Sequence, residues 1–168
     1  GGGTSLISAI SGVDVFVTDA FRDDFRQVLV TIYRVEGSTD GVNFQTLFED
    51  ATGQTINVAA LSDSAVLLAR ASATTATFTQ LRVTIGEQLT LVTPGGVSSG
   101  VPVAEGIGTA TGDGKRVITA AVTTSEAGMV IVDFDLAAFQ MEGGRVRPVI
   151  RGGDPVAFYP SGPRGCRL

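Results

Sequence analysis

Two aspartates in the last third of the sequence are the residues best placed for chemistry. Asp133 and Asp135 stand two positions apart in an apolar run, so on a strand both carboxylates face the same side. Such a pair could bind Ca²⁺ or act as acid and base. A later run carries Arg145, Arg147 and Arg151 on one face, and these cations could pair with the aspartates across strands. We therefore expect structural ion pairs here and no metal site.

A second group of carboxylates, Asp19, Asp23 and Asp24, follows an alternating apolar run. Oxygen-rich loops can bind Ca²⁺, but aspartate is also favoured in turns because it accepts hydrogen bonds from nearby backbone N–H groups. We interpret this group as a turn. Residues 112–115 resemble part of a phosphate-binding loop, but Thr109 stands where that motif needs glycine, so no nucleotide site is expected.

Aromatic residues and a single thiol complete the candidates for binding or reactivity. Phe21, Phe25 and Tyr33 could form an exposed platform on which sugars stack, but aromatic residues more often fill a sandwich core. Cys166 lies between two arginines near the end of the chain. Nearby cations make a thiol more reactive, so Cys166 could react or pair with another chain. A plain free thiol is the simpler interpretation.

The rest of the composition excludes several kinds of site. None of the 168 residues is histidine, which excludes histidine-based triads and histidine metal ligands. One cysteine excludes an intrachain disulfide. The net charge is -5, whereas a nucleic-acid surface needs clustered lysine and arginine, so no nucleic-acid partner is expected. No apolar run approaches the ~18 residues of a membrane-spanning helix. We predict no enzymatic activity, no cofactor and no metal.

The candidate site residues lie within or next to short apolar runs that are separated by glycine. Glycine makes up 22 of the 168 residues, and the glycines fall between alternating runs, which is typical of β-structure. Residues 58–71 carry the only plausible helix, of one or two turns. Gly86 would join two strands as a hairpin, and Pro148 predicts an edge strand or a bulge. We expect strands at residues 13–18, 28–35, 44–49, 78–85, 88–93, 116–122, 129–136 and 145–151.

Alternation along these runs also predicts the core, because every second residue of a strand faces the same side. The residues expected to be buried are Val15, Val30, Ile32, Leu81, Val83, Val132, Phe134 and Ile150. The pattern predicts an all-β fold, an antiparallel β-sandwich with Greek-key connections of the immunoglobulin or transthyretin type and one short helix. A closed barrel is the structural alternative. We expect an N-terminal arm (1–12), a sandwich domain (13–151) and a C-terminal tail (152–168).

Five stretches, in order along the chain, resemble one protein family. They are VDVFVTDA at 13–20, DFRQVLVTI at 24–32, TFTQLRV at 77–83, VDFDL at 132–136 and RPVIR at 147–151. Together they are similar to the domain-of-unknown-function family 4382, a group of bacterial and archaeal extracytoplasmic domains. Phe21 stands where that family usually has proline. The resemblance implies a β-sandwich on a secreted protein, often a lipoprotein, with no established catalytic residues.

The first residues suggest how such a domain could associate. Residues 4–10 form a short apolar arm that could add as a strand to the open sheet edge of a neighbour. We expect Leu6, Ile7 and Ile10 to be buried against another subunit; the alternative is that the arm folds back on its own sandwich. The leading Gly-Gly-Gly would fit a lipoprotein whose acylated cysteine lies just upstream, so a lipid anchor is possible.

The leading hypothesis is a non-enzymatic, extracytoplasmic structural protein. Its partners would be copies of itself, assembled through strand or arm exchange into a surface filament or layer. The alternative is a ligand- or glycan-binding module of a surface lipoprotein. A metal-dependent enzyme is a third and weaker hypothesis, because it would have to rely on carboxylates alone. The expected location is extracellular or at the cell surface.

Overall fold

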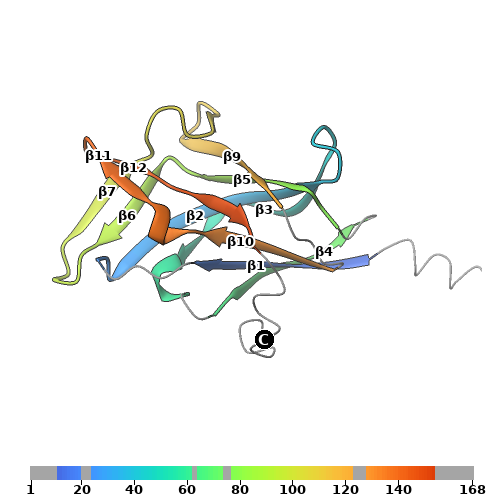
Figure 1. The fold of residues 1–168 in the computed structure, drawn as a ribbon, viewed down its shortest axis with the longest axis horizontal. Coiled ribbons are helices and arrows are strands. Elements are labelled where there is room, and N and C mark those ends of the chain that lie inside the picture. Colours follow the sequence, from blue (N-terminus) through green and yellow to red (C-terminus); the bar gives the residue numbers. More distant parts are fainter. Residues whose placement is uncertain (1–10, 20–23, 62–63, 74–76, 123–127, 154–168) are drawn as a thin grey trace, which may run out of the picture.

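A computed structural model of the chain describes residues 11–19, 24–61, 64–73, 77–122 and 128–153, and every structural statement below concerns these ranges. They form a two-layer, mainly antiparallel β-sandwich, which confirms the predicted fold class (Figure 1). No helix in the described ranges is long or apolar enough to cross a bilayer. The elements, in order, are β1 (Ser11–Asp19), β2 (Gln27–Ser38), β3 (Phe44–Asn57), the 3₁₀ turn η1 (Val58–Ala60), β4 (Val66–Ala73), β5 (Gln80–Gly86), β6 (Gln88–Val92), β7 (Ser98–Pro102), β8 (Thr109–Ala110), β9 (Lys115–Ala121), β10 (Met129–Phe134), the 3₁₀ turn η2 (Leu136–Ala138), β11 (Gln140–Glu142), β12 (Arg145–Arg147) and β13 (Ile150–Gly152).

The two layers are a smaller and a larger sheet. The smaller sheet has the order β13-β10-β1-β4, and its central pair, β1 and β10, is parallel, whereas its other pairs are antiparallel. The larger sheet has the order β7-β6-β2-β5-β9-β8, with β3 on the other side of β2. A small hairpin of β11 and β12 joins the end of β7 through one bridge between Val103 and Val146. The chain therefore crosses repeatedly between the layers.

The core fills the space between the two sheets. Val13, Val15 and Val17 of β1 are fully buried, as alternation along this run predicts. All eight residues expected in the core are buried, each with 7% or less of its surface exposed. The prediction of the core is therefore confirmed. It succeeds because inward and outward residues alternate along a strand whichever partner that strand has.

β2 is the central strand of the larger sheet. It pairs with β3 on one side and with β5 and β6 on the other. Its register against β5 shifts between Ile32 and Arg34, so Tyr33 is an extra residue opposite β5. A bulge of this kind changes which residues face inward. Val30 and Ile32 are buried before the bulge, and Val35 is buried after it.

The helix of one or two turns expected within residues 58–71 is a single 3₁₀ turn, and the later part of this stretch is a strand. Only Val58–Ala60 form one 3₁₀ turn, and Val66–Ala73 form strand β4, which pairs with β1. The apolar stripe that fits a helix also fits a half-buried edge strand, and pairing with β1 decides between them. The Thr18 hydroxyl donates to the carbonyls of Leu61 (3.3 Å) and Ser64 (2.7 Å), which ties these two residues to the end of β1.

The expected hairpin across Gly86 is also wrong. β5 and β6 run in the same direction along the same edge of β2, since Ile85 pairs with Ile32 and Thr90 pairs with Leu29. A tight two-residue reversal needs glycine with a positive φ, and Gly86 does not have one. Gly86 therefore lies at the junction where β5 continues into β6 along the same edge of β2, and it does not form a hairpin turn.

Pro148 divides the expected strand at 145–151 into two. β12 ends at Arg147 and pairs with β11, whereas β13 begins at Ile150 and pairs with β10 at the edge of the smaller sheet. Proline has no backbone N–H to donate to a ladder, which explains the break.

Candidate functional site

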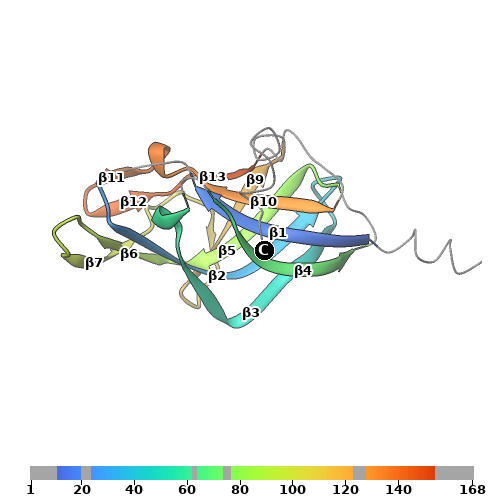
Figure 2. The same ribbon diagram turned by 90° about the horizontal axis from the view of Figure 1, so that it is seen from below.

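The two sides of the sandwich differ in how they are closed. On one side β13 of the smaller sheet comes so close to β9 that a Cβ on Gly152 would lie 2.5 Å from Val122 Cγ2. On the other side the smaller sheet ends at β4, which within the described ranges pairs only with β1. Figure 2 shows β4 on this free side, with β3 of the larger sheet next to it. The backbone groups on the outer edge of β4 have no ladder partner among the described residues, which is the arrangement that can accept another strand.

An apolar groove lies along this free edge. Its volume is about 350 Å³, and it is lined by Gln54, Thr55 and Ile56 of β3, Leu61 of the connection, and Val66, Leu67 and Leu68 of β4. We call it the edge groove. Five of these seven residues are aliphatic, and Ile56, Leu61 and Leu68 also contact the main core. The groove is therefore a lateral extension of the core that reaches the surface.

Val66 shows that the edge groove is incompletely covered. Its surface is 39% exposed, and the other large hydrophobic residues with high exposure in the described ranges are Val42, Val97 and Met141. Val42 and Val97 lie in turns, and Met141 lies in the small hairpin of β11 and β12. Val66 is thus the one that belongs to a strand of the two main sheets. A single exposed valine is ordinary, but this one lies next to an apolar groove and an edge that is unpaired among the described residues.

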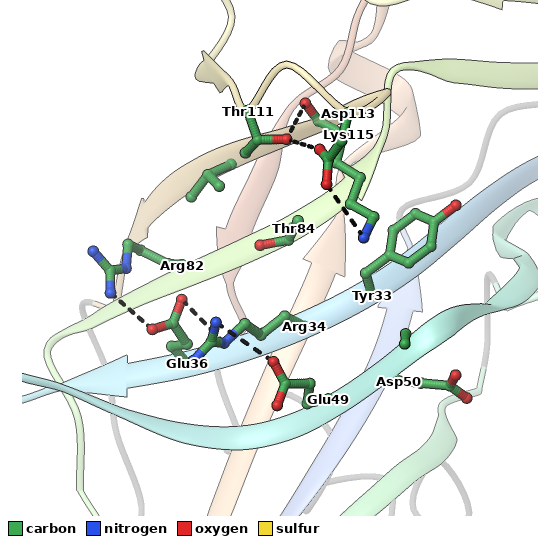
Figure 3. A pocket seen from close by; sticks show the side chains of 12 residues that line it. Tyr33, Arg34, Glu36, Glu49, Asp50, Arg82, Thr84, Thr111, Asp113 and Lys115 are labelled. Carbon is green, nitrogen blue, oxygen red and sulfur yellow. Dashed lines mark hydrogen bonds and ion pairs between the residues drawn. The ribbon is translucent and has the colours of Figure 1, made fainter.

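A second depression crosses the outer face of the larger sheet, with a volume of about 790 Å³ (Figure 3). We call it the charged groove. Its residues come from β2, β3, β5, β9 and the turn before β9. They are Tyr33, Arg34, Glu36, Glu49, Asp50, Ala51, Arg82, Thr84, Thr111, Asp113, Lys115 and Val117.

Most charges in the charged groove are paired with one another. Glu36 is buried, and it accepts a 2.7 Å hydrogen bond from Arg82 while Arg34 Nε lies 3.8 Å away. Arg34 also reaches Glu49, with 3.5 Å between Nη1 and Oε2. The Arg82 guanidinium stacks over the Phe44 ring at 3.8 Å. This network ties β2, β3 and β5 together on their outer face.

Tyr33 is held at the other end of the charged groove. Because Tyr33 is the extra residue of the β2 bulge, it lies on the outer face together with its neighbour Arg34 (Figure 3). Lys115 Nζ lies 4.5 Å from the centre of the Tyr33 ring, and it also approaches Asp113 at 3.7 Å. A Cβ on Gly53 would lie 2.9 Å from the ring, so glycine is needed there. Tyr33 is therefore not a core residue, and Lys115 lies over its ring.

Of the predicted carboxylate sites, the structure describes the pair Asp133 and Asp135, whereas residues 20–23 of the expected turn lie outside the described ranges. Asp135 pairs with Arg151 at 3.0 Å, as expected of the arginine-bearing strand, whereas Arg145 donates to the carbonyl of Val103 at 3.5 Å. Asp133 lies in β10, whereas Asp135 directly follows that strand, and Oδ1 of Asp133 is buried without a hydrogen-bond partner. Burial and the nearby Asp135 charge raise the pKa of Asp133, and Arg151 opposes this shift. The described residues contain no cluster of three metal-ligating side chains.

Several predicted site residues lie outside the described ranges. They are the arm residues Leu6, Ile7 and Ile10, together with Phe21, Asp23 and Cys166. Phe25 is described, and it packs against the core as expected. Neither groove was predicted from the sequence. The edge groove depends on β4, which was expected to be helical, and the charged groove depends on the bulge at Tyr33.

Comparison with known protein families gives one match over most of the chain. The model of a domain of unknown function (DUF4382) matches residues 11–145, which include β1 to β11. Comparisons with curated proteins and with solved structures give no significant match. The matched region holds most of both sheets and all residues of the edge and charged grooves. The chain belongs to the DUF4382 family of domains of unknown function.

Proposed function

We propose that this protein is a non-enzymatic, extracytoplasmic structural protein that assembles with copies of itself into a surface filament or layer. The N-terminal arm of one copy adds to the sandwich of the next. The observation that carries the proposal is the free edge of β4, where backbone groups without a ladder partner among the described residues lie next to the exposed Val66 and partly buried aliphatic side chains. Strand addition at such an edge satisfies backbone groups and buries apolar surface in one step.

The energetics support exchange of an apolar arm. Ordering an extended segment costs about 1–2 kcal/mol per residue, which an arm free in water cannot recover. Burying Leu6 and Ile10 on one face of the added strand would contribute roughly 3–6 kcal/mol, and burial of Ile7 on the other face and ladder hydrogen bonds would add to this. The charges of the described residues are largely satisfied within the chain. Apolar and backbone contacts are therefore the principal means of association that the described surface offers.

Deleting residues 1–10 tests the proposal, with the mass of the assembly measured by sedimentation velocity. We expect the full chain to form large species and the shortened chain to remain a monomer with nearly the same melting temperature. The opposite result is also informative. Assembly that persists unchanged while the monomer loses stability would show that the arm folds back on its own sandwich and would overturn arm exchange.

The charged groove supports a second candidate function, a ligand- or glycan-binding module. Its volume suits several sugar units, and it offers carboxylates, guanidinium groups and the Tyr33 ring, although Lys115 lies over that ring. Calorimetric titration with cellohexaose and maltohexaose tests this function. Saturable heat that Lys115→Ala enhances, by uncovering the ring, would support it. No saturable heat at millimolar sugar, with either the natural chain or Lys115→Ala, would contradict it.

A further inference from the structure

We propose that the edge groove is the acceptor for the arm of a second copy, with Leu6 and Ile10 seated in it and Ile7 on the opposite face of the added strand. The inference rests on the proposed function, because it names the partner surface of that assembly. It requires three things. The groove must lie out of reach of its own arm, the arm must match its chemistry, and the geometry must allow repetition.

The register of β1 against β4 places the edge groove far from the root of its own arm. Ser11, where β1 begins, pairs with Ala73, whereas Val17 pairs with Val66. The groove residues Val66 to Leu68 therefore lie five to seven residues along β4 from that root. At ~3.3 Å per residue, this is about 16–23 Å along the strand.

An arm that approached the free edge of its own β4 would also have to pass around the end of β4. That detour spans two strand spacings, or about 10 Å, so the straight-line distance to the groove is at least about 19 Å. Leu6 stands five residues before Ser11 and reaches at most ~18 Å when fully extended. Ile10 directly precedes Ser11 and reaches only ~4 Å. Ile10 cannot come near the edge groove of its own chain, so an arm that seats both Leu6 and Ile10 there must belong to another copy.

The alternation of the arm fits a groove with one apolar wall. In a strand, Leu6, Ser8 and Ile10 face one side, and Ile7 and Ala9 face the other. The side that carries Leu6 and Ile10 would meet Ile56, Leu61 and Leu68, which are partly buried and pack against the core. Gln54 and Thr55 supply polar groups on the β3 side of the groove. The arm backbone would complete the ladder that β4 leaves open.

The donor and the acceptor lie toward opposite ends of the smaller sheet. β1 starts beside the end of β4 (Figures 1 and 2). The residues of β4 that line the edge groove, Val66 to Leu68, are at the start of that strand. Each copy can therefore donate at one end and accept toward the other. A contact between two different surfaces of this kind repeats without closing, unless its rotation happens to form a ring, and so produces a linear fibre.

Disulfide trapping between two distinguishable chains tests the inference. In a Cys166→Ser background, donor chains carry Leu6→Cys or Ile10→Cys, and acceptor chains of different mass, enlarged by a tag, carry Val66→Cys. The matched control acceptor carries Val97→Cys, because Val97 is also an exposed valine, at 66%, but lies in the turn between β6 and β7. We expect at least about tenfold more donor–acceptor disulfide with Val66→Cys than with Val97→Cys, because docking raises the effective concentration of the two thiols.

The outcomes separate this inference from the proposed function. Equal trapping at both valines, or none at Val66→Cys while the chains still assemble, would overturn the edge groove as acceptor and leave arm exchange standing. A disulfide within a single chain that carries Ile10→Cys and Val66→Cys would overturn the inference directly. Failure of the unsubstituted chain to assemble at all would overturn the proposed function itself. Ile7→Asp should reduce assembly less than Leu6→Asp or Ile10→Asp, and a reversed order would contradict the assigned faces.

Discussion

Arg151 forms an ion pair with Asp135, with 3.0 Å between Nε and Oδ2, although the backbone ladder places Arg151 directly opposite Asp133. The guanidinium thus satisfies the carboxylate at the end of β10. Asp133 keeps one buried oxygen without a hydrogen-bond partner. The two aspartates that the sequence brings together therefore have different environments, and the difference can be measured.

Asp133→Asn should raise the melting temperature at pH 7. Burial, and to a lesser extent the Asp135 charge, raises the pKa of Asp133 above its ordinary value of 3.8. Between 3.8 and the raised pKa, the folded protein binds more protons than the unfolded chain, so stability falls as pH rises through this window. Asparagine avoids this loss because it does not ionise. In melting curves from pH 3 to pH 7, the melting temperature of Asp133→Asn should exceed that of the natural chain by an amount that grows with pH. A lower melting temperature for Asp133→Asn at pH 7 would contradict the assignment.

Asp40→Asn should have the opposite pH dependence. The backbone N–H groups of Asn43 and Val42 lower the pKa of Asp40, together with side-chain hydrogen bonds from Asn43 and Ser38. The charged form thus stabilises the turn between β2 and β3 above the unfolded-state value of 3.8, and this contribution is lost as pH falls toward the lowered pKa. The variant should have a lower melting temperature than the natural chain at pH 7, and this difference in melting temperature should be smaller at pH 2. A gap that is constant across this range would show that the charge of Asp40 is not involved.

Leu81→Ala should destabilise the fold by ~2–5 kcal/mol, because Leu81 is fully buried between the sheets and its truncation leaves a cavity. The exposed Val97 offers a matched control, and Val97→Ala should change stability by less than about 0.5 kcal/mol. Urea denaturation of both variants measures the difference. Similar midpoints for the two would mean that the assigned core is incorrect.

Chelation should leave the fold intact. The carboxylates of Asp40 and Asp50 are engaged by turn N–H groups, and those of Asp14 and Asp135 by arginines. A ligand that binds only the folded state stabilises it by mass action, so removal of a structural metal would lower the melting temperature. We expect equal melting temperatures with and without EDTA. A drop of many degrees would show a metal site that these contacts do not account for.

The sequence predicts local features of this fold better than its pairings. The period-two pattern identifies Val15, Val83 and Val132 as buried because a strand alternates its faces whatever its neighbour is. It does not distinguish a hairpin from a continuous path at Gly86, since that choice depends on how residues 88–92 fit against β2. Strand partners are distant in sequence, and no local propensity encodes them.

The same limit explains why both grooves were missed. The apolar residues of β4 fit a helix and an edge strand equally well, and only pairing with β1 selects the strand. The bulge that places Tyr33 next to Arg34 on the outer face is set by the register of β2 against β5. By contrast, the turn at Asp40 is local: Asp40 accepts bonds from residues two and three positions ahead, and Gly41 has a positive φ.

Electron microscopy of the purified chain tests the central claim of self-assembly most directly. Negatively stained samples of the unsubstituted protein and of Val66→Lys would be imaged side by side, with Val97→Lys as the matched control. The account predicts long assemblies, either single filaments or filaments packed into sheets, for the unsubstituted protein and for Val97→Lys. It predicts dispersed particles for Val66→Lys, because a charge at the free edge of β4 opposes strand addition. Dispersed single particles of the unsubstituted protein at every concentration would contradict it.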